Sequence, residues 1–258
     1  MSPRPKSRFT SREPYLGVDL DAFAHLPGFV EEIGPRLRNL HAAGCESLIV
    51  PLSLPMSDTS VIARNNVHCQ GIVFDGAIED LSSRLDELLI YRAHFIIVDI
   101  PPRRDPDDEK VLESFANEVS KCAAALSPRG MKLLLRNRRG DTRGGSANCR
   151  LARAVEGSNG LAGYCVDIYA LWGDGTPWDL FVAEAGHRIH LVEIRDEWNG
   201  KPVAFGTGDL PFAKMVDVLD RIPDLHGIYF AASRSDVNLM DIAITSLGSV
   251  QDLVDHHR

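Results

Sequence analysis

The amino-acid sequence predicts an α/β protein, a single (β/α)₈ barrel. Eight strand-like runs alternate with helical patterns along the 258 residues. Most of these runs are apolar throughout, as expected for a parallel sheet that is covered on both faces. No Gly-x-Gly-x-x-Gly follows the first run, which disfavours the main rival, a doubly wound open sheet.

The expected strands occur at regular intervals. They are residues 15–20, 46–52, 68–74, 94–100, 131–137, 163–169, 190–196 and 227–233. Three helices are clear between them because apolar residues recur every three to four positions: 81–91, 108–126 and 210–222. The Arg- and Gly-rich residues 136–146 are expected to form the loop after the fifth strand.

The whole barrel is expected to span residues 14–258. Residues 1–13 are basic and contain prolines, but no apolar run follows them, so a flexible, solvated tail is predicted rather than a targeting segment. No stretch approaches the roughly 18 apolar residues of a membrane span. We therefore expect one soluble domain with no membrane partner.

Composition narrows the class of partner. The net charge of −8 disfavours a nucleic-acid partner, because binding phosphates requires a basic face. The five cysteines are odd in number and show no Cys-x-x-Cys spacing, so buried thiols in a reducing cytoplasm are expected. The predicted partner is a small molecule. The sequence does not decide the oligomeric state, and a homo-oligomer is left open.

Charged residues recur where the expected strands end. Asp99 ends the fourth strand, Arg136 the fifth, Asp167 the sixth, and Glu193 and Arg195 end the seventh. On a two-residue period these side chains face the mouth of the barrel, where barrel enzymes hold their sites. The alternative is that some of them lie on loops and pair with solvent. As a set they predict a polar pocket.

Aromatic and histidine residues near these strands are less specific. Around HLVEIRDEW, residues 190–198, alternation places Ile189, Leu191, Glu193 and Arg195 on one face, so two opposite charges follow two apolar residues. Trp172 and Trp198 follow the sixth and seventh strands, where an indole stacks on a sugar or packs on a helix equally well. His190, at the strand's start, is expected to be a surface or satisfied histidine.

The C-terminal half resembles a known family. GYCVDIYALWGDG (163–175) and RIHLVEIRDEWNGKPVAFGTGDLPF (188–212) look like the xylose-isomerase-like barrels, the sugar phosphate isomerase/epimerase superfamily. In that family the seventh strand ends in Lys-Asp, which Arg195 and Asp196 match. A loop similar to GTGDLPF (206–212) follows it. The resemblance implies a barrel that acts on carbohydrates.

The metal site of that family is mostly substituted here. Its four ligand positions, a Glu, an Asp, a His and a Glu, fall on Arg136, Asp167, Glu193 and near Ala231, so only Asp167 is kept. Histidines frequent in the family fall on Asp99 and Ala170. An arginine cannot ligate a cation and stays protonated. We therefore expect no metal, with Arg136 between Asp167 and Glu193 in place of the ion.

An alternative keeps a metal. Asp99, Asp167 and Glu193 together offer a hard oxygen site for Mg²⁺ or Mn²⁺ if Arg136 turns away. A histidine-rich zinc site of the kind seen in the nuclease branch of the superfamily is less expected.

Two classes of function follow from this pattern. In the first, Glu193, Asp167 and Arg136 are catalytic, and Asp99, Arg195, Trp172 and Trp198 bind a small carbohydrate-like or anionic ligand. The reaction is then isomerase- or epimerase-like, or that of a lyase or hydrolase. In the second, the barrel is a catalytically silent binding or partner subunit, as the alanines at positions 170 and 231 favour.

Overall fold

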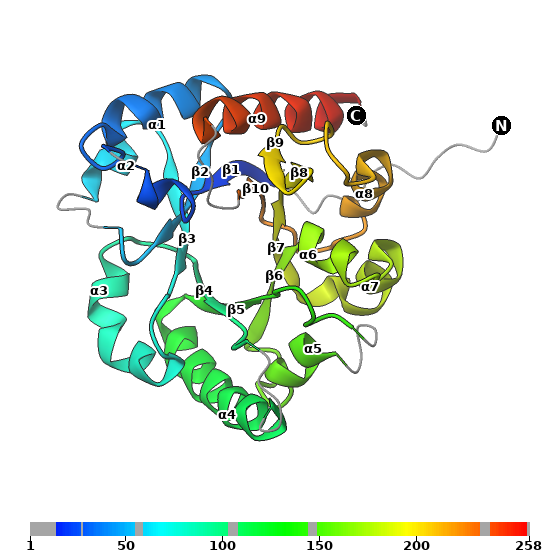
Figure 1. The fold of residues 1–258 in the computed structure, drawn as a ribbon. Coiled ribbons are helices and arrows are strands. Elements are labelled where there is room, and N and C mark those ends of the chain that lie inside the picture. The colour runs from blue at the N-terminus through cyan, green and yellow to red at the C-terminus, as the bar shows by residue number, and fades with distance from the viewer. Residues whose placement is uncertain are drawn as a thin grey trace.

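Eight parallel strands close into a barrel in the computed structural model, which describes residues 14–26, 28–54, 59–102, 108–143, 149–232 and 238–256. The helices surround the strands (Figure 1). The order around the barrel is β1-β2-β3-β4-β5-β6-β7-β10, closed by pairing of β10 with β1. The predicted (β/α)₈ barrel is confirmed. The predicted tail, residues 1–13, lies outside the described residues.

All eight predicted strands are present. They are β1 (Tyr15–Asp19), β2 (Ser47–Pro51), β3 (His68–Val73), β4 (Phe95–Asp99), β5 (Lys132–Arg136), β6 (Ala162–Asp167), β7 (Ile189–Ile194) and β10 (Gly227–Phe230). The short strands β8 (Asp196–Trp198) and β9 (Lys201–Val203) form an antiparallel hairpin after β7.

The helices agree with the sequence pattern where they are long. The α-helices are α1 (Ile33–Ala42), α2 (Ser60–Arg64), α3 (Leu85–Leu89), α4 (Asp108–Leu126), α5 (Arg150–Val155), α6 (Ile168–Gly173), α7 (Trp178–Ala185), α8 (Phe212–Leu219) and α9 (Leu239–His256). The 3₁₀ turns are η1 (Phe23–His25), η2 (Ile78–Arg84), η3 (Ser127–Arg129) and η4 (Gly186–Arg188). The helix predicted at 81–91 is therefore split between η2 and α3. The one predicted at 210–222 begins only after Pro211.

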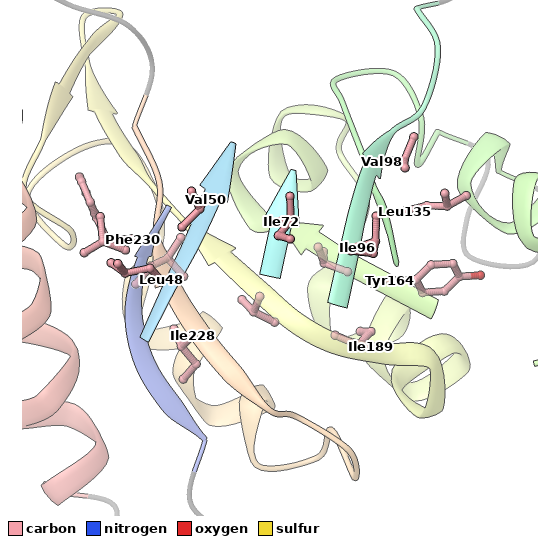
Figure 2. Packing of buried hydrophobic residues seen from close by; sticks show 14 of the residues in the cluster. Leu48, Val50, Ile72, Ile96, Val98, Leu135, Tyr164, Ile189, Ile228 and Phe230 are labelled. Atoms are coloured by element: carbon pink, nitrogen blue, oxygen red, sulfur yellow. The ribbon is translucent and has the colours of Figure 1, made fainter. Parts of the chain in front are cut away.

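Two apolar layers hold the barrel together. Side chains that point outward from the strands pack under the surrounding helices, as Val50, Ile72 and Leu135 do (Figure 2). Eight residues fill the interior: Ile49, Val73, Phe95, Ile97, Leu134, Cys165, Leu191 and Tyr229. Ser47 Oγ and Tyr229 Oη form a hydrogen bond of 2.9 Å inside this core. A Cβ on Gly17 would overlap the Tyr229 ring, so the close approach of β1 to that ring requires glycine.

Two strands carry an extra residue near their start. Leu48 and Ile49 pair with Cys69 and Gly71, which leaves Gln70 as a bulge in β3. Tyr164 and Cys165 pair with Ile189 and Leu191, which leaves His190 as a bulge in β7. Because of the extra residue, side chains before a bulge point to the opposite face of the sheet from the one that strict alternation would give them.

The bulge in β7 corrects one sequence expectation. Ile189 belongs to the outer apolar layer, whereas Leu191 fills the barrel interior. The prediction that Ile189 shares a face with Leu191 and Glu193 was therefore wrong, because strict alternation assumes an unbroken ladder. The prediction holds for Leu191 and Glu193, which follow the bulge.

His190 is buried by its bulge rather than lying at the surface. Its ring stacks on Phe95 with centroids 5.9 Å apart and lies 5.7 Å from the His226 ring. Burial, followed by the charges of Lys132 and His226, lowers the pKa of His190 to about 4. The unfolded chain then binds more protons than the folded chain between about pH 6.5 and 4.

This pKa predicts an acid-sensitive contribution to stability. As pH falls from about 6.5 to 4, wild type should lose about 3 kcal/mol of unfolding free energy relative to a His190→Leu variant. Urea unfolding of both proteins at several pH values measures the difference. The exposed His187 offers a control, since His187→Leu should follow wild type. A wild type that keeps its stability relative to His190→Leu at pH 4 would contradict the prediction.

Within the described residues, no helix is both long and apolar enough to cross a membrane.

Candidate active site

The mouth at the carboxyl ends of the strands holds a cavity of about 390 Å³. The structure brings five predicted site residues to it, from β4, β5, β6 and the end of β7. The described lining residues are Asp19, Asp21, Ala22, Asp99, Arg136, Asn137, Arg138, Arg139, Asp167, Glu193, Arg195, Ala231 and Ala232. The lining thus combines five carboxyl groups with four guanidinium groups.

The two predicted tryptophans lie elsewhere. Trp172 packs against Tyr169, with ring centroids 5.6 Å apart, and Trp198 lies on the β8–β9 hairpin with 55% of its surface exposed. Neither is among the described residues that line the mouth cavity. A role for them in binding the ligand stays a prediction.

Arg136 is the centre of a buried ion-pair network. Its guanidinium donates to both carboxylate oxygens of Asp99, from Nε to Oδ1 at 2.6 Å and from Nη2 to Oδ2 at 3.2 Å. Nη1 donates to Asp19 Oδ2 at 2.8 Å and to Glu193 Oε1 at 3.1 Å. The Arg136 side chain is only 11% exposed, and those of Asp19 and Glu193 are 3% exposed. One buried cation therefore contacts three carboxyl groups.

A second pair lies beside this network. Arg195 Nη2 is 2.9 Å from Asp167 Oδ2, and the Arg195 guanidinium lies over the Tyr169 ring at 5.2 Å. The expectation that Arg136 lies between Asp167 and Glu193 is thus corrected in part. Arg136 contacts Glu193, whereas the partner of Asp167 is Arg195.

The position of Asp167 is defined by its neighbours. Its Oδ1 accepts from Ala170 N at 2.9 Å and so caps the start of α6. The Asn137 amide bonds both the backbone N–H and the backbone carbonyl of Asp167, at 2.8 and 3.0 Å. These two hydrogen bonds join the ends of β5 and β6. On its other side β6 pairs with β7, where Asp167 is the register neighbour of Glu193, so the two carboxyl groups lie side by side at the mouth.

Asp19 is the site residue that sequence reasoning missed. It ends β1 just as Asp99 ends β4, and it is almost fully buried against Arg136. The rule that selected the other residues, a charge at the carboxyl end of an apolar strand, also selects Asp19. The signal was present in YLGVDL, where a single aspartate follows the strand's apolar residues.

The carboxyl groups differ in how readily they ionise. Burial, followed by the charge of Glu193, raises the pKa of Asp19 well above its ordinary value. Burial also raises the pKa of Glu193, and the Arg136 charge only partly opposes this. For Asp99, the guanidinium groups of Arg136 and Arg138 outweigh burial and lower the pKa. The three carboxyl groups that share Arg136 therefore differ: the pKa values of Asp19 and Glu193 are raised, and that of Asp99 is lowered.

These shifts predict a stability that declines as pH rises. A raised folded-state pKa means that the folded chain binds more protons than the unfolded chain above about pH 4. Relative to a Glu193→Gln variant, which is neutral at every pH, wild type should lose unfolding free energy as pH rises from 4 through the folded-state pKa. Urea unfolding at pH 4 to 9 measures this difference. A difference that is constant with pH would contradict the raised pKa. The His190 effect is present in both proteins and cancels.

Two arginines form the outer rim of the mouth. Arg138 pairs with Asp99 and is 59% exposed, and Arg139 is also exposed. The loop that carries them is held by two buried aspartates. Asp141 Oδ2 accepts from Arg138 N at 2.7 Å, and Asp174 accepts from the backbone of Gly140 and Thr142. The predicted loop after β5 thus presents positive charge to the mouth. Its residues 144–148 lie outside the described part.

The GTGDLPF loop is built around Asp196. The Asp196 carboxylate, which is 1% exposed, accepts from the backbone N–H groups of Gly206, Gly208 and Leu210 at 2.8 to 3.1 Å. A Cβ on Gly208 would overlap this carboxylate, so glycine is required there. The motif that supports the resemblance is therefore structural: it folds the chain after β7 rather than lining the mouth.

Two carboxyl groups of the alternative metal site are already paired with an arginine. The carboxyl groups of Asp99 and Glu193, on which the alternative metal site depends, already bond the Arg136 guanidinium. A divalent cation would lie beside the guanidinium of Arg136. This group stays protonated, so it keeps its positive charge and repels the ion. Among the described residues, no group of three or more His, Cys, Asp and Glu side chains has an arrangement that could hold a metal.

Comparison with known proteins places the fold. No family model and no curated protein matches the sequence. Among solved structures, a sugar phosphate isomerase/epimerase from Parabacteroides distasonis is similar with a TM-score of 0.76 and 10% identity, covering 94% of this chain and 95% of that one. An L-ribulose 3-epimerase has a TM-score of 0.75 and 14% identity, over 95% and 96%. The IolI protein with a binding zinc atom has a TM-score of 0.72 and 11% identity, over 95% and 99%.

These similarities cover nearly the whole of each chain, so the resemblance noticed in the sequence is confirmed for the fold. The protein has the xylose-isomerase-like barrel fold of the sugar phosphate isomerases and epimerases.

Proposed function

We propose that this protein is a metal-independent, isomerase- or epimerase-like enzyme that moves a proton on a small, anionic, carbohydrate-like ligand. The observation that carries the proposal is that the carboxyl groups of Asp167 and Glu193 lie side by side at the mouth. They are register neighbours on β6 and β7, both line the mouth cavity, and their partners differ. Two carboxyl groups in different environments are a recurring arrangement for an acid and a base.

The two carboxyl groups take different roles. Glu193, whose pKa is raised by burial, acts as the acid. Asp167, hydrogen-bonded to Arg195 and to the start of α6, acts as the base that removes a proton from the carbon beside a carbonyl. The carbonyl oxygen becomes an enolate oxygen as the C–H bond breaks. Glu193 then returns a proton to the carbon skeleton.

The arginines supply positive charge without a metal. Arg195 lies beside the base and is placed to stabilise the developing enolate oxygen. Arg136, fully paired with three carboxyl groups, sets the charge state of Glu193 rather than binding the ligand. Arg138 and Arg139, exposed at the rim, bind the anionic group of the ligand. The structural likeness to an L-ribulose 3-epimerase supports a carbohydrate-like substrate.

Proton exchange tests the proposal. Ketoses, their phosphates and sugar acids are incubated with the protein in D₂O and EDTA, and loss of the C–H signal is followed by NMR. Wild type should exchange the proton of at least one substrate, and Glu193→Gln and Asp167→Asn should each slow exchange by about a hundredfold or more. Asp209→Asn, at an exposed position of the GTGDLPF loop, is the control and should keep the wild-type rate.

Other results would support the alternatives. Saturable binding of these ligands without exchange would identify a silent binding protein. Exchange that EDTA abolishes and Mg²⁺ or Mn²⁺ restores would identify the carboxylate-only metal site on Asp99, Asp167 and Glu193.

A further inference from the structure

A second cavity lies at the end of the barrel opposite the candidate active site. It has a volume of about 530 Å³, compared with about 390 Å³ at the mouth. It lies where β1, β3 and β4 begin, between α2 and the segment that follows α3; Figure 1 shows where these elements lie in the ring. Volumes of roughly 300 to 1,000 Å³ are typical of small-molecule sites.

The cavity has a buried floor and an exposed rim. At the floor Val67 is 1% exposed and Ile62 and Gln70 are each 4% exposed, whereas Ile90 at the rim is 62% exposed. A ligand of small-molecule size therefore enters from solvent and meets a mostly desolvated inner end.

Gln70 is the polar group at that inner end. It is the bulged residue of β3, and a bulge redirects a side chain out of the normal alternation. Its side-chain amide makes no hydrogen bond to another described residue, and the residue is only 4% exposed. The amide is not among the fully enclosed polar atoms that lack a partner, so it is reached from the cavity. An unpaired amide that lines a cavity is a free donor and acceptor for a ligand.

The rest of the lining indicates the ligand's chemistry. None of the described lining residues is acidic, although the chain carries a net charge of −8 and the mouth cavity has five carboxyl groups. Tyr91 and His94 offer ring faces, and Arg92 offers a cation at the exposed rim. A glutamine amide pairs in a bidentate manner with an edge that carries a donor beside an acceptor, as a nucleobase does.

From this lining we propose that the amino-terminal end of the barrel binds a nucleoside monophosphate. The base pairs with Gln70 and stacks on the aromatic rings, and the phosphate lies near Arg92 at the rim. This site is separate from the proposed active site, and either assignment can fail without the other.

Calorimetry on the full chain tests the site with AMP, UMP, adenosine and ribose 5-phosphate. At least one nucleotide should bind, and ribose 5-phosphate, which lacks a base, should bind at least about tenfold more weakly. Gln70→Met, which keeps the length of the side chain and removes the amide, should weaken the nucleotide by at least about tenfold. Arg92→Asn, which suits the left-handed backbone at this position (φ 53°), should weaken AMP but not adenosine.

A thermal melt separates loss of binding from loss of folding. Without nucleotide, Gln70→Met should melt close to the wild-type temperature, because it keeps the length of the side chain and breaks no side-chain hydrogen bond to a described residue. AMP or UMP should raise the melting temperature of wild type and of Glu193→Gln, whose change lies at the other end, but not that of Gln70→Met. No binding of either nucleotide, binding unaffected by Gln70→Met, or binding lost instead on Arg138→Met at the mouth would overturn the proposal.

Discussion

Replacing Arg136 by methionine should destabilise the protein at pH 7 by about 3 to 5 kcal/mol, the cost of leaving buried charge without its partner. The substitution keeps most of the side-chain volume and removes the guanidinium that joins Asp19, Asp99 and Glu193. Because two of these groups are almost fully buried, water cannot replace the guanidinium. Chemical denaturation at pH 7 measures the loss.

The same variant should recover on acidification. Carboxyl groups left without a cation take up protons more readily, so the deficit of Arg136→Met relative to wild type should shrink as pH falls toward about 4. Denaturation curves at pH 7, 5.5 and 4 follow this recovery.

Arg138→Met is the matched control for Arg136→Met. Arg138 also pairs with Asp99, but it is 59% exposed, so its loss should change stability by less than about 1 kcal/mol. If both variants lost the same stability, burial of the Arg136 network would not be what makes it important. Equal loss would also remove the basis for treating Arg136 as a fixed substitute for a metal ion.

Replacing Asp196 by alanine should cost about 3 kcal/mol and disorder the GTGDLPF loop. The carboxylate bonds four backbone N–H groups, those of Glu197, Gly206, Gly208 and Leu210. Alanine leaves these donors unpaired, and charge-assisted hydrogen bonds are among the stronger ones in proteins. Chemical denaturation gives the loss of stability, and amide hydrogen exchange of residues 206–210 reports local opening.

Two controls separate this role from a general effect of charge. Asp209→Ala removes an exposed carboxylate from the same loop and should change stability by less than about 0.5 kcal/mol. Asp196→Asn keeps the shape but only one strong acceptor, so its cost should lie between those of the other two variants. Unchanged protection of residues 206–210 in Asp196→Ala would show that the loop does not depend on this carboxylate.

The strands and the polar mouth were predictable because both depend on local pattern. Apolar runs of strand length, separated by helical periods, imply a covered parallel sheet. In such a sheet the carboxyl ends of all strands meet at one face, so Asp99, Arg136, Asp167 and Glu193 were expected to converge. The omission of Asp19 was an error in applying this rule, since its position in the sequence meets it equally well.

The ion-pair partners were not predictable in the same way. The pattern of each strand places its charged residue at the mouth. The pairing of carboxyl and guanidinium groups depends instead on the tilt and stagger of strands that are distant in sequence. Arg136 and Asp19 are 117 residues apart, and β5 and β1 do not pair. The expected Arg136–Asp167 contact was replaced for this reason by contacts with Asp19 and Asp99.

The barrel and the charged character of its mouth follow from local pattern, because the spacing of apolar residues and the common direction of parallel strands are both visible in the sequence. The positions of the bulges at Gln70 and His190 do not, because a bulge is a register shift between two strands that are distant in sequence. The bulges bury two polar side chains at the amino-terminal end of the barrel. The residue pattern of a single strand does not reveal a register shift against its neighbour.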